Sequence, residues 1–193
     1  MMKRVNYADR QVGDILLAAC PGAMHNAIWL AERLSHPEAP LDFPVTHAGI
    51  VGPVAGYLTE AWLGGGQDSV AAVVEDKKYD GQPVEIWRTE ATNEQIWAAF
   101  TDYLHTYVPE HYGLPDLFGF EYKAVIRALT GKDIDNPIYT TPVCSEGVLL
   151  MMKLYCQHGC AALEWAMEIA VRDEDPLRLR EHIIAHAGTN ILG

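Results

Sequence analysis

The chain has 193 residues, of which 49% are hydrophobic and 21% are charged, so it can bury a core within one domain and is not a disordered chain. Its formal net charge of −12 argues against binding the phosphate backbone of nucleic acid and against docking on anionic lipid. Four cysteines in a chain this long and apolar do not indicate a disulfide framework, so we expect reduced thiols.

The amino-terminal residues do not have the pattern of a secretion signal. Basic residues occur within Met1–Arg10, but no apolar stretch of signal-peptide length follows them. No apolar run elsewhere is long enough to cross a bilayer. We therefore expect no transmembrane segment and a cytoplasmic location, with export by another route left open. The oligomeric state is not indicated by the sequence.

The first half of the chain predicts short strands and one helix. Helical spacing of apolar residues, including Trp29 and Leu34, predicts a helix over Asn26–Leu34. Three prolines between 37 and 44 then indicate a loop. The predicted strands are 12–18 after an initial turn, 46–52, 56–62, 69–74 and 84–88.

The second half predicts helices. Thr92–Gln95 is typical of a helix start, and Trp97, Phe100 and Leu104 follow at helical spacing as expected core residues. Further helices are predicted over 117–129, from Cys144 to about Gln157 with an interruption at Gly159, and over 161–171 and 177–187. The order of elements, with strands first and helices after, predicts an α+β fold with an antiparallel sheet.

Cys144 is the candidate nucleophile. Pro142 favours a loop before it, and the apolar run Val148–Met152 after it predicts a helix, so the thiol is expected at a helix amino terminus. Unpaired backbone N–H groups and the helix dipole favour a thiolate there. A nucleophilic cysteine also requires a base within reach and a third group to orient that base.

His47 and Glu60 are the candidate base and orienting residue. His47 begins a predicted strand, and Ala48–Gly49 after it would allow another backbone to approach closely. Glu60 lies on a neighbouring predicted strand between apolar residues, where its carboxylate can accept the ring N–H of His47 and fix the tautomer. Glu75 and Glu85 are the other strand carboxylates, for which simple solvation is the alternative.

The order of these motifs resembles a known family. Gly13–Leu17 and His47–Val51 resemble the paired strand motifs of NlpC/P60 cysteine peptidases, in which the nucleophile usually precedes those strands. Here Cys144–Glu146 follows them, which resembles the circularly permuted, YiiX-like group, whose relatives include the lecithin:retinol acyltransferase type. The resemblance covers roughly residues 12–155.

This resemblance implies a papain-like fold in which the helix that carries Cys144 packs on an antiparallel sheet that carries His47. It implies that Cys144 is the nucleophile, His47 the base and Glu60 the orienting residue. The chain is then a single domain over 1–193, with its core at about 12–155 and a helical tail at about 160–193. Val143 stands where many unpermuted members have an aspartate that helps hold a peptide amine, so recognition of a free amino terminus is not implied.

The expected function is a thiol hydrolase that cleaves an amide bond in a cell-wall-type peptide, without a cofactor or metal. The alternatives are an acyltransferase or thioesterase on lipid acyl groups and a non-catalytic binding module that keeps the fold. A zinc-stapled helical protein is a further reading, but Cys156 and Cys160 form only one cysteine pair, whereas structural zinc usually takes about four ligands. Asp14 is expected to shape a turn.

Overall fold

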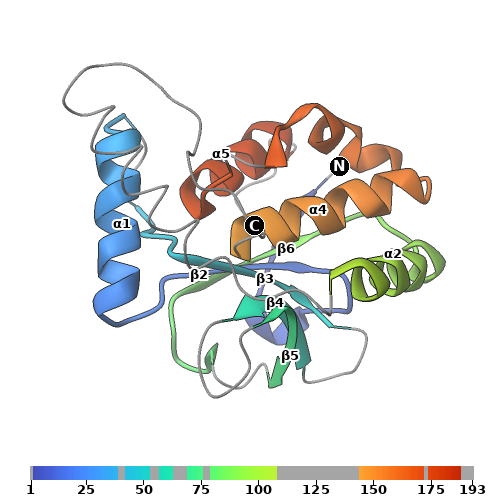
Figure 1. Cartoon of the computed structure of the whole chain (residues 1–193), viewed down its shortest axis with the longest axis horizontal. Coiled ribbons are helices and arrows are strands. Elements are labelled where there is room, and N and C mark those ends of the chain that lie inside the picture. Colours follow the sequence, from blue (N-terminus) through green and yellow to red (C-terminus); the bar gives the residue numbers. More distant parts are fainter. Residues whose placement is uncertain are drawn as a thin grey trace.

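The chain forms an α+β fold in which helices lie against an antiparallel sheet (Figure 1). The computed structural model describes residues 2–38, 42–52, 57–62, 69–75, 79–107, 144–171 and 174–187. The strands in these ranges are β1 (Lys3–Val5), β2 (Ile15–Ala18), β3 (His47–Val51), β4 (Tyr57–Trp62), β5 (Ser69–Glu75) and β6 (Val84–Arg88). The helices are α1 (Ala23–Ser35), α2 (Asn93–Tyr107), α4 (Cys144–Gln157), α5 (Pro176–His186) and the 3₁₀ helices η1 (Tyr7–Asp9) and η3 (Ala161–Glu168).

The sheet has six strands in the order β1-β6-β2-β3-β4-β5, and every neighbouring pair is antiparallel. The five predicted strands are confirmed, and β1 is an addition to them. Its three residues include exposed Lys3 and Arg4, so it has no apolar alternation from which a strand could be predicted. It is an edge strand that pairs with β6, with Lys3 opposite Arg88.

Alternate residues of the central strand β2 enter two different cores. Ile15 and Leu17 belong to the main core, which also contains residues of α2, α4, η3 and α5. Leu16 and Ala18 belong to a smaller core on the other face of the sheet. All four β2 side chains are therefore buried, which explains why the strand is apolar throughout instead of alternating.

Side-chain caps set the starts of α2 and α5. Thr92 N donates to Gln95 Oε1 at 2.8 Å and Gln95 N donates to Thr92 Oγ1 at 3.3 Å, which is the reciprocal capping predicted there. At α5, Asp175 Oδ1 accepts from Arg178 N at 2.8 Å, and Pro176 occupies the first turn. The helix therefore begins one residue earlier than predicted.

The expected core face of α2 is partly wrong. Phe100 is buried as predicted, but Trp97 is 53% exposed. The buried side chains of α2 follow one stripe at helical spacing, and Trp97 lies about 100° around the helix from the first of them. The side chain of Leu104 lies outside the described residues. The buried stripe of α2 consists of Ile96, Ala99, Phe100 and Tyr103.

The α1 helix presents polar residues inward. Trp29 and Leu34, two of the apolar residues whose spacing predicted the helix, are 37% and 42% exposed. Glu32 and His36 are buried instead, and His25 is half-buried. Apolar spacing correctly predicted a helix here, although its start at Ala23 is earlier than expected, but it did not predict which face would be covered.

The carboxy-terminal segment covers the sheet as part of the main core, to which Leu179 and Ile183 of α5 belong. Before it, residues 161–168 form a 3₁₀ helix instead of the expected α-helix. The hydrogen bonds from Leu163 N to Cys160 O and from Ile169 N to Ala166 O each span three residues, which is the tighter 3₁₀ pattern.

Some expectations concern residues beyond the described ranges. The predicted helix over 117–129, the loop over 133–142 and Val143 are outside them. Of the helices in the part of the chain that is described, none is both long and apolar enough to span a membrane.

Candidate active site

Cys144 is the first residue of α4, as predicted, and its side chain is only 3% exposed. The helix lies against β3, β4 and α2 (Figure 1). The thiol lines a cavity of 10 Å³ together with Ile50 of β3 and Thr59 of β4. A space of this size accommodates about one water molecule, so this cavity does not hold a substrate in the conformation observed.

Polar groups from two other elements reach this cavity. A Cβ built on Gly147, one turn after Cys144, would lie 2.7 Å from Tyr103 Oη, so a larger residue there would require the Tyr103 side chain to shift. The Thr59 hydroxyl is buried and has no hydrogen-bond partner among the described residues. Sequence reasoning singled out neither Tyr103 nor Thr59, because a tyrosine on a helix and a threonine on a strand are ordinary core residues.

His47 is the first residue of β3, as predicted, and is 4% exposed. Its ring centroid lies 6.2 Å from that of His25, with the two planes at 84°. On another side it lies 6.3 Å from the ring of Tyr79, with the planes at 16°. The candidate base is therefore a buried imidazole held between two other rings.

The pairing of β3 separates His47 from the face that α4 covers. Ala48 and Ile50 lie in the main core with α4, whereas His47 pairs with Ala18, which lies in the smaller core on the opposite face. The structure thus brings the helix start and the histidine strand together, while the register turns His47 toward the other face of the sheet.

Glu60 lies in β4, the strand next to β3, as predicted. Thr59 pairs with Ile50 on the face of the Cys144 cavity. The side chain of Glu60 is outside the described residues, so its contact with His47 stays a prediction.

Two other carboxylates have structural roles. Asp14 Oδ2 accepts from Gln11 N at 2.7 Å, which confirms that Asp14 shapes the turn before β2. Glu85, for which solvation was the alternative, is buried and accepts hydrogen bonds from Arg180 and Trp87. The side chain of Glu75 lies outside the described residues.

A buried acidic cluster missed by sequence reasoning lies where α1 meets the start of α5. Glu32 is 3% exposed; its Oε1 accepts from Leu177 N at 3.3 Å, and its Oε2 has no hydrogen-bond partner among the described residues. Burial, followed by the charges of Asp175 and Cys144, raises the pKa of Glu32 well above its ordinary value. Because like charges repel, a neutral Glu32 is compatible with a thiolate at Cys144.

The same cluster links α5 to α1 and α4. His36 Nε2 lies 3.0 Å from Asp175 Oδ2, and Ser145 Oγ donates to Glu174 O at 2.5 Å. The residue after Cys144 is therefore tied to the segment that begins α5. A glutamate between apolar residues of a helix is ordinarily a solvated residue, which is why the sequence did not single out Glu32.

Glu32→Gln is expected to make the protein less sensitive to rising pH. The pKa of Glu32 is higher in the folded state than in the unfolded state, so its contribution to stability is complete below the unfolded pKa and is lost as pH rises through the folded pKa. Gln cannot ionise and avoids that loss, so the variant gains stability relative to the parent as pH rises above the ordinary pKa of a glutamate, by at most about 1.4 kcal/mol per pH unit.

Urea unfolding at several pH values measures this difference. The exposed Glu38, just after α1, supplies the control Glu38→Gln, which should follow the parent more closely. If the free energy of unfolding changes with pH in the same way for the parent and for Glu32→Gln, a raised pKa at Glu32 is contradicted.

Two wider hollows of the described surface lie away from the candidate residues. The wider hollows, of 620 and 690 Å³, lie beside Arg10 and Arg88 and include none of the candidate residues. The described residues contain no group of three or more His, Cys, Asp or Glu side chains that could hold a metal ion. Cys156 and Cys160 are free thiols at the end of α4.

Comparison of the chain with protein-family models finds no match. Comparison with curated proteins finds no match either.

Proposed function

We propose that this chain is a thiol hydrolase that cleaves an amide bond, of the kind found in cell-wall peptides, with Cys144 as nucleophile, His47 as base and Glu60 as the orienting residue. The observation that carries the proposal is the position of Cys144, a buried thiol at the first residue of a helix that lies over β3 and β4. A helix amino terminus is an environment that favours a thiolate.

The proposed reaction is a two-step acyl transfer. His47 takes the Cys144 proton, the thiolate forms a bond to the carbonyl carbon, and the backbone N–H groups at the start of α4 stabilise the oxyanion. The His47 imidazolium then protonates the leaving amine as the C–N bond breaks. Water, deprotonated by His47, attacks the thioester, and the acid and the thiol are released.

Selective alkylation tests this proposal. Iodoacetamide at pH 7 is expected to modify Cys144 before the other three cysteines, and His47→Ala is expected to slow that modification at least tenfold, because the thiolate then loses its imidazolium partner. The rate is followed for each cysteine by mass spectrometry of proteolytic peptides.

Burial makes this test demanding. Cys144 is buried, whereas Cys20 and Cys156 are partly exposed, so accessibility alone predicts that Cys20 and Cys156 react first. Faster reaction at Cys144 would therefore require chemical activation. If Cys144 reacts no faster than the other thiols, or if His47→Ala leaves its alkylation rate unchanged, the catalytic assignment fails.

The second candidate is a binding module that keeps the fold without catalysis. Two observations favour it, namely the small cavity at Cys144 and the register of β3, which places His47 on the face of the sheet opposite α4. Contacts at catalytic sites are often long or unformed before substrate binds, so these observations do not outweigh the position of the thiol. Turnover of amide or ester substrates separates the two candidates.

A further inference from the structure

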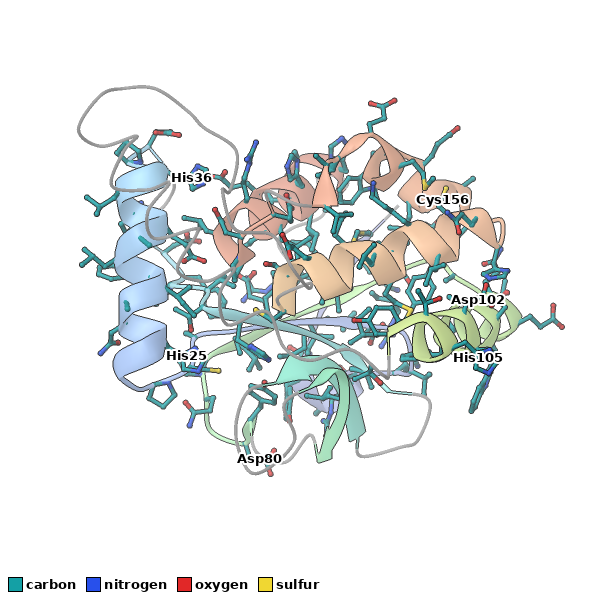
Figure 2. All side chains as sticks on the ribbon, viewed as in Figure 1. His25, His36, Asp80, Asp102, His105 and Cys156 are labelled. Atoms are coloured by element: carbon teal, nitrogen blue, oxygen red, sulfur yellow. The ribbon has the colours of Figure 1, made fainter. Side chains whose placement is uncertain are left out.

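The inner line of α1 consists of titratable residues that face the candidate site. His25, Glu32 and His36 are spaced by seven and four residues, so they lie within about 20° of one line along the helix. Figure 2 labels His25 near one end of α1 and His36 just past the other. His25 is near His47, and the charge of Cys144 acts on Glu32. One helix therefore lines both proposed catalytic residues.

His25 is anchored to the backbone immediately before His47. Its Nδ1 lies 3.4 Å from Thr46 O, which accepts when Nδ1 carries the proton. Thr46 is itself held on both sides, because its N donates to Ala18 O at 2.9 Å and its Oγ1 accepts from Cys20 N at 3.0 Å. The distance between α1 and the start of β3 is thus set by several contacts around a single residue.

The His25 ring also limits how the His47 ring can turn. The two planes are nearly perpendicular at 84°, while Tyr79 lies almost parallel to His47 at 16°. With the perpendicular ring of His25 on one side and the nearly parallel ring of Tyr79 on another, the His47 imidazole is restricted in its rotation about the Cβ–Cγ bond. We propose that His25 is a positioning residue of the Cys144 site, which holds the ring of His47 in the plane that the reaction uses. This inference rests on the proposed role of His47 as the base.

A charge effect accompanies the positioning. A protonated His25 would place a positive charge beside the His47 ring, and a positive charge disfavours protonation of a neighbouring imidazole. The titratable groups whose rings are described beside His47 are His25 and Tyr79. The elements around it also carry Cys20 after β2, Glu32 and Arg33 on α1, Glu85 on β6, and Cys144 and Glu146 on α4, together with Glu60 of β4, whose side chain is outside the described residues. The charge of Arg33 is the same in every variant, so removal of His25 has a defined sign.

The test combines NMR with alkylation in three variants. His25→Phe keeps a flat ring without a charge, His25→Ala removes the ring, and His105→Phe changes an exposed histidine on α2, well away from His25 in Figure 2. Nitrogen-resolved NMR of the imidazoles gives the titration midpoint of His47, and iodoacetamide gives the rate at Cys144. Urea unfolding reports whether each variant is folded.

We expect the His47 midpoint to rise by at least 0.3 pH unit in both His25 variants, which is about a twofold change in proton affinity. We expect alkylation of Cys144 at pH 7 to slow about tenfold in His25→Ala and to recover most of its rate in His25→Phe, because the ring restores the position of His47. His105→Phe should change neither quantity.

Unchanged His47 midpoints and alkylation rates in both His25 variants would overturn the positioning role, even where His47→Ala still slows alkylation and the proposed function stands. The opposite result is also distinguishable. If His47→Ala leaves alkylation unchanged, the proposed function fails. The His47 midpoint then still decides whether the two histidines are coupled.

Discussion

Cys144→Ala is expected to reduce the hydrolysis of an amide substrate by about 10³-fold or more, because no other group in the proposed site can form the covalent intermediate. Cys144→Ser should recover little of this activity, since a hydroxyl is far less acidic than a thiol and His47 would have to remove its proton during the reaction. Release of new amino groups from a panel of cell-wall peptides measures the rate.

The same panel separates the substrate classes when acyl esters are added to it. Cys156→Ala is the matched control, because Cys156 lies in the last turn of the same helix and its loss should leave turnover unchanged. Turnover of esters alone would identify the acyltransferase or thioesterase alternative. Amide hydrolysis that survives Cys144→Ala would contradict the assigned nucleophile, and the lack of turnover of either class would favour the binding module.

Arg180→Met is expected to destabilise the fold by up to about 3–5 kcal/mol, because the buried Glu85 carboxylate loses its two hydrogen bonds from Arg180 and keeps only the longer ion pair to the exposed Arg4, at 3.4 Å. Arg180 Nε and Nη2 donate to the two oxygens of Glu85, each at 2.9 Å, and the side chains are 4% and 1% exposed. Burial lowers the pKa of Arg180, but the hydrogen bonds to Glu85 and Asp42 more than offset this, so the pKa stays above its ordinary value. The pair joins α5 to β6. Urea unfolding followed by circular dichroism gives the loss.

A double variant tests whether the unpaired charge is the cause. Arg180→Met with Glu85→Gln removes both charges and leaves an acceptor for Trp87 Nε1, which donates to Glu85 Oε2 at 3.2 Å. We expect the double variant to be more stable than Arg180→Met alone, with a coupling energy above about 1 kcal/mol. If the stability losses of the two substitutions are additive, the destabilisation comes from lost side-chain packing and not from an unpaired charge.

The links between α5 and the rest of the fold connect this stability to the candidate site. At the start of α5, Leu177 N donates a hydrogen bond to the carboxylate of Glu32 on α1. Just before α5, Glu174 O accepts a hydrogen bond from Ser145, the residue after Cys144. Arg180 anchors the same helix to the sheet one turn later. The amino terminus of α4 is therefore linked to the segment before α5, and α5 is linked in turn to α1 and to the sheet.

Local sequence determined most of the secondary structure. Apolar alternation and turn residues predicted five strands, and the pair Thr92 and Gln95 predicted the start of α2. Pro142 and the run after Cys144 predicted that the thiol would begin a helix. Each of these features depends on residues that are close together in the chain, so it can be predicted from the sequence alone.

Only the tertiary structure decided which faces are covered and which distant groups meet. Trp97 and Leu34 have helical spacing but are exposed, because the position of a helix on the sheet determines which of its sides is buried. The contact of His25 with His47 and that of Arg180 with Glu85 join residues far apart in sequence. The sequence by itself determined that a thiol begins a helix after a block of strands. The packing of α4 and α5 on the sheet and the side-chain links from α1, which are long-range contacts, decided what surrounds that thiol.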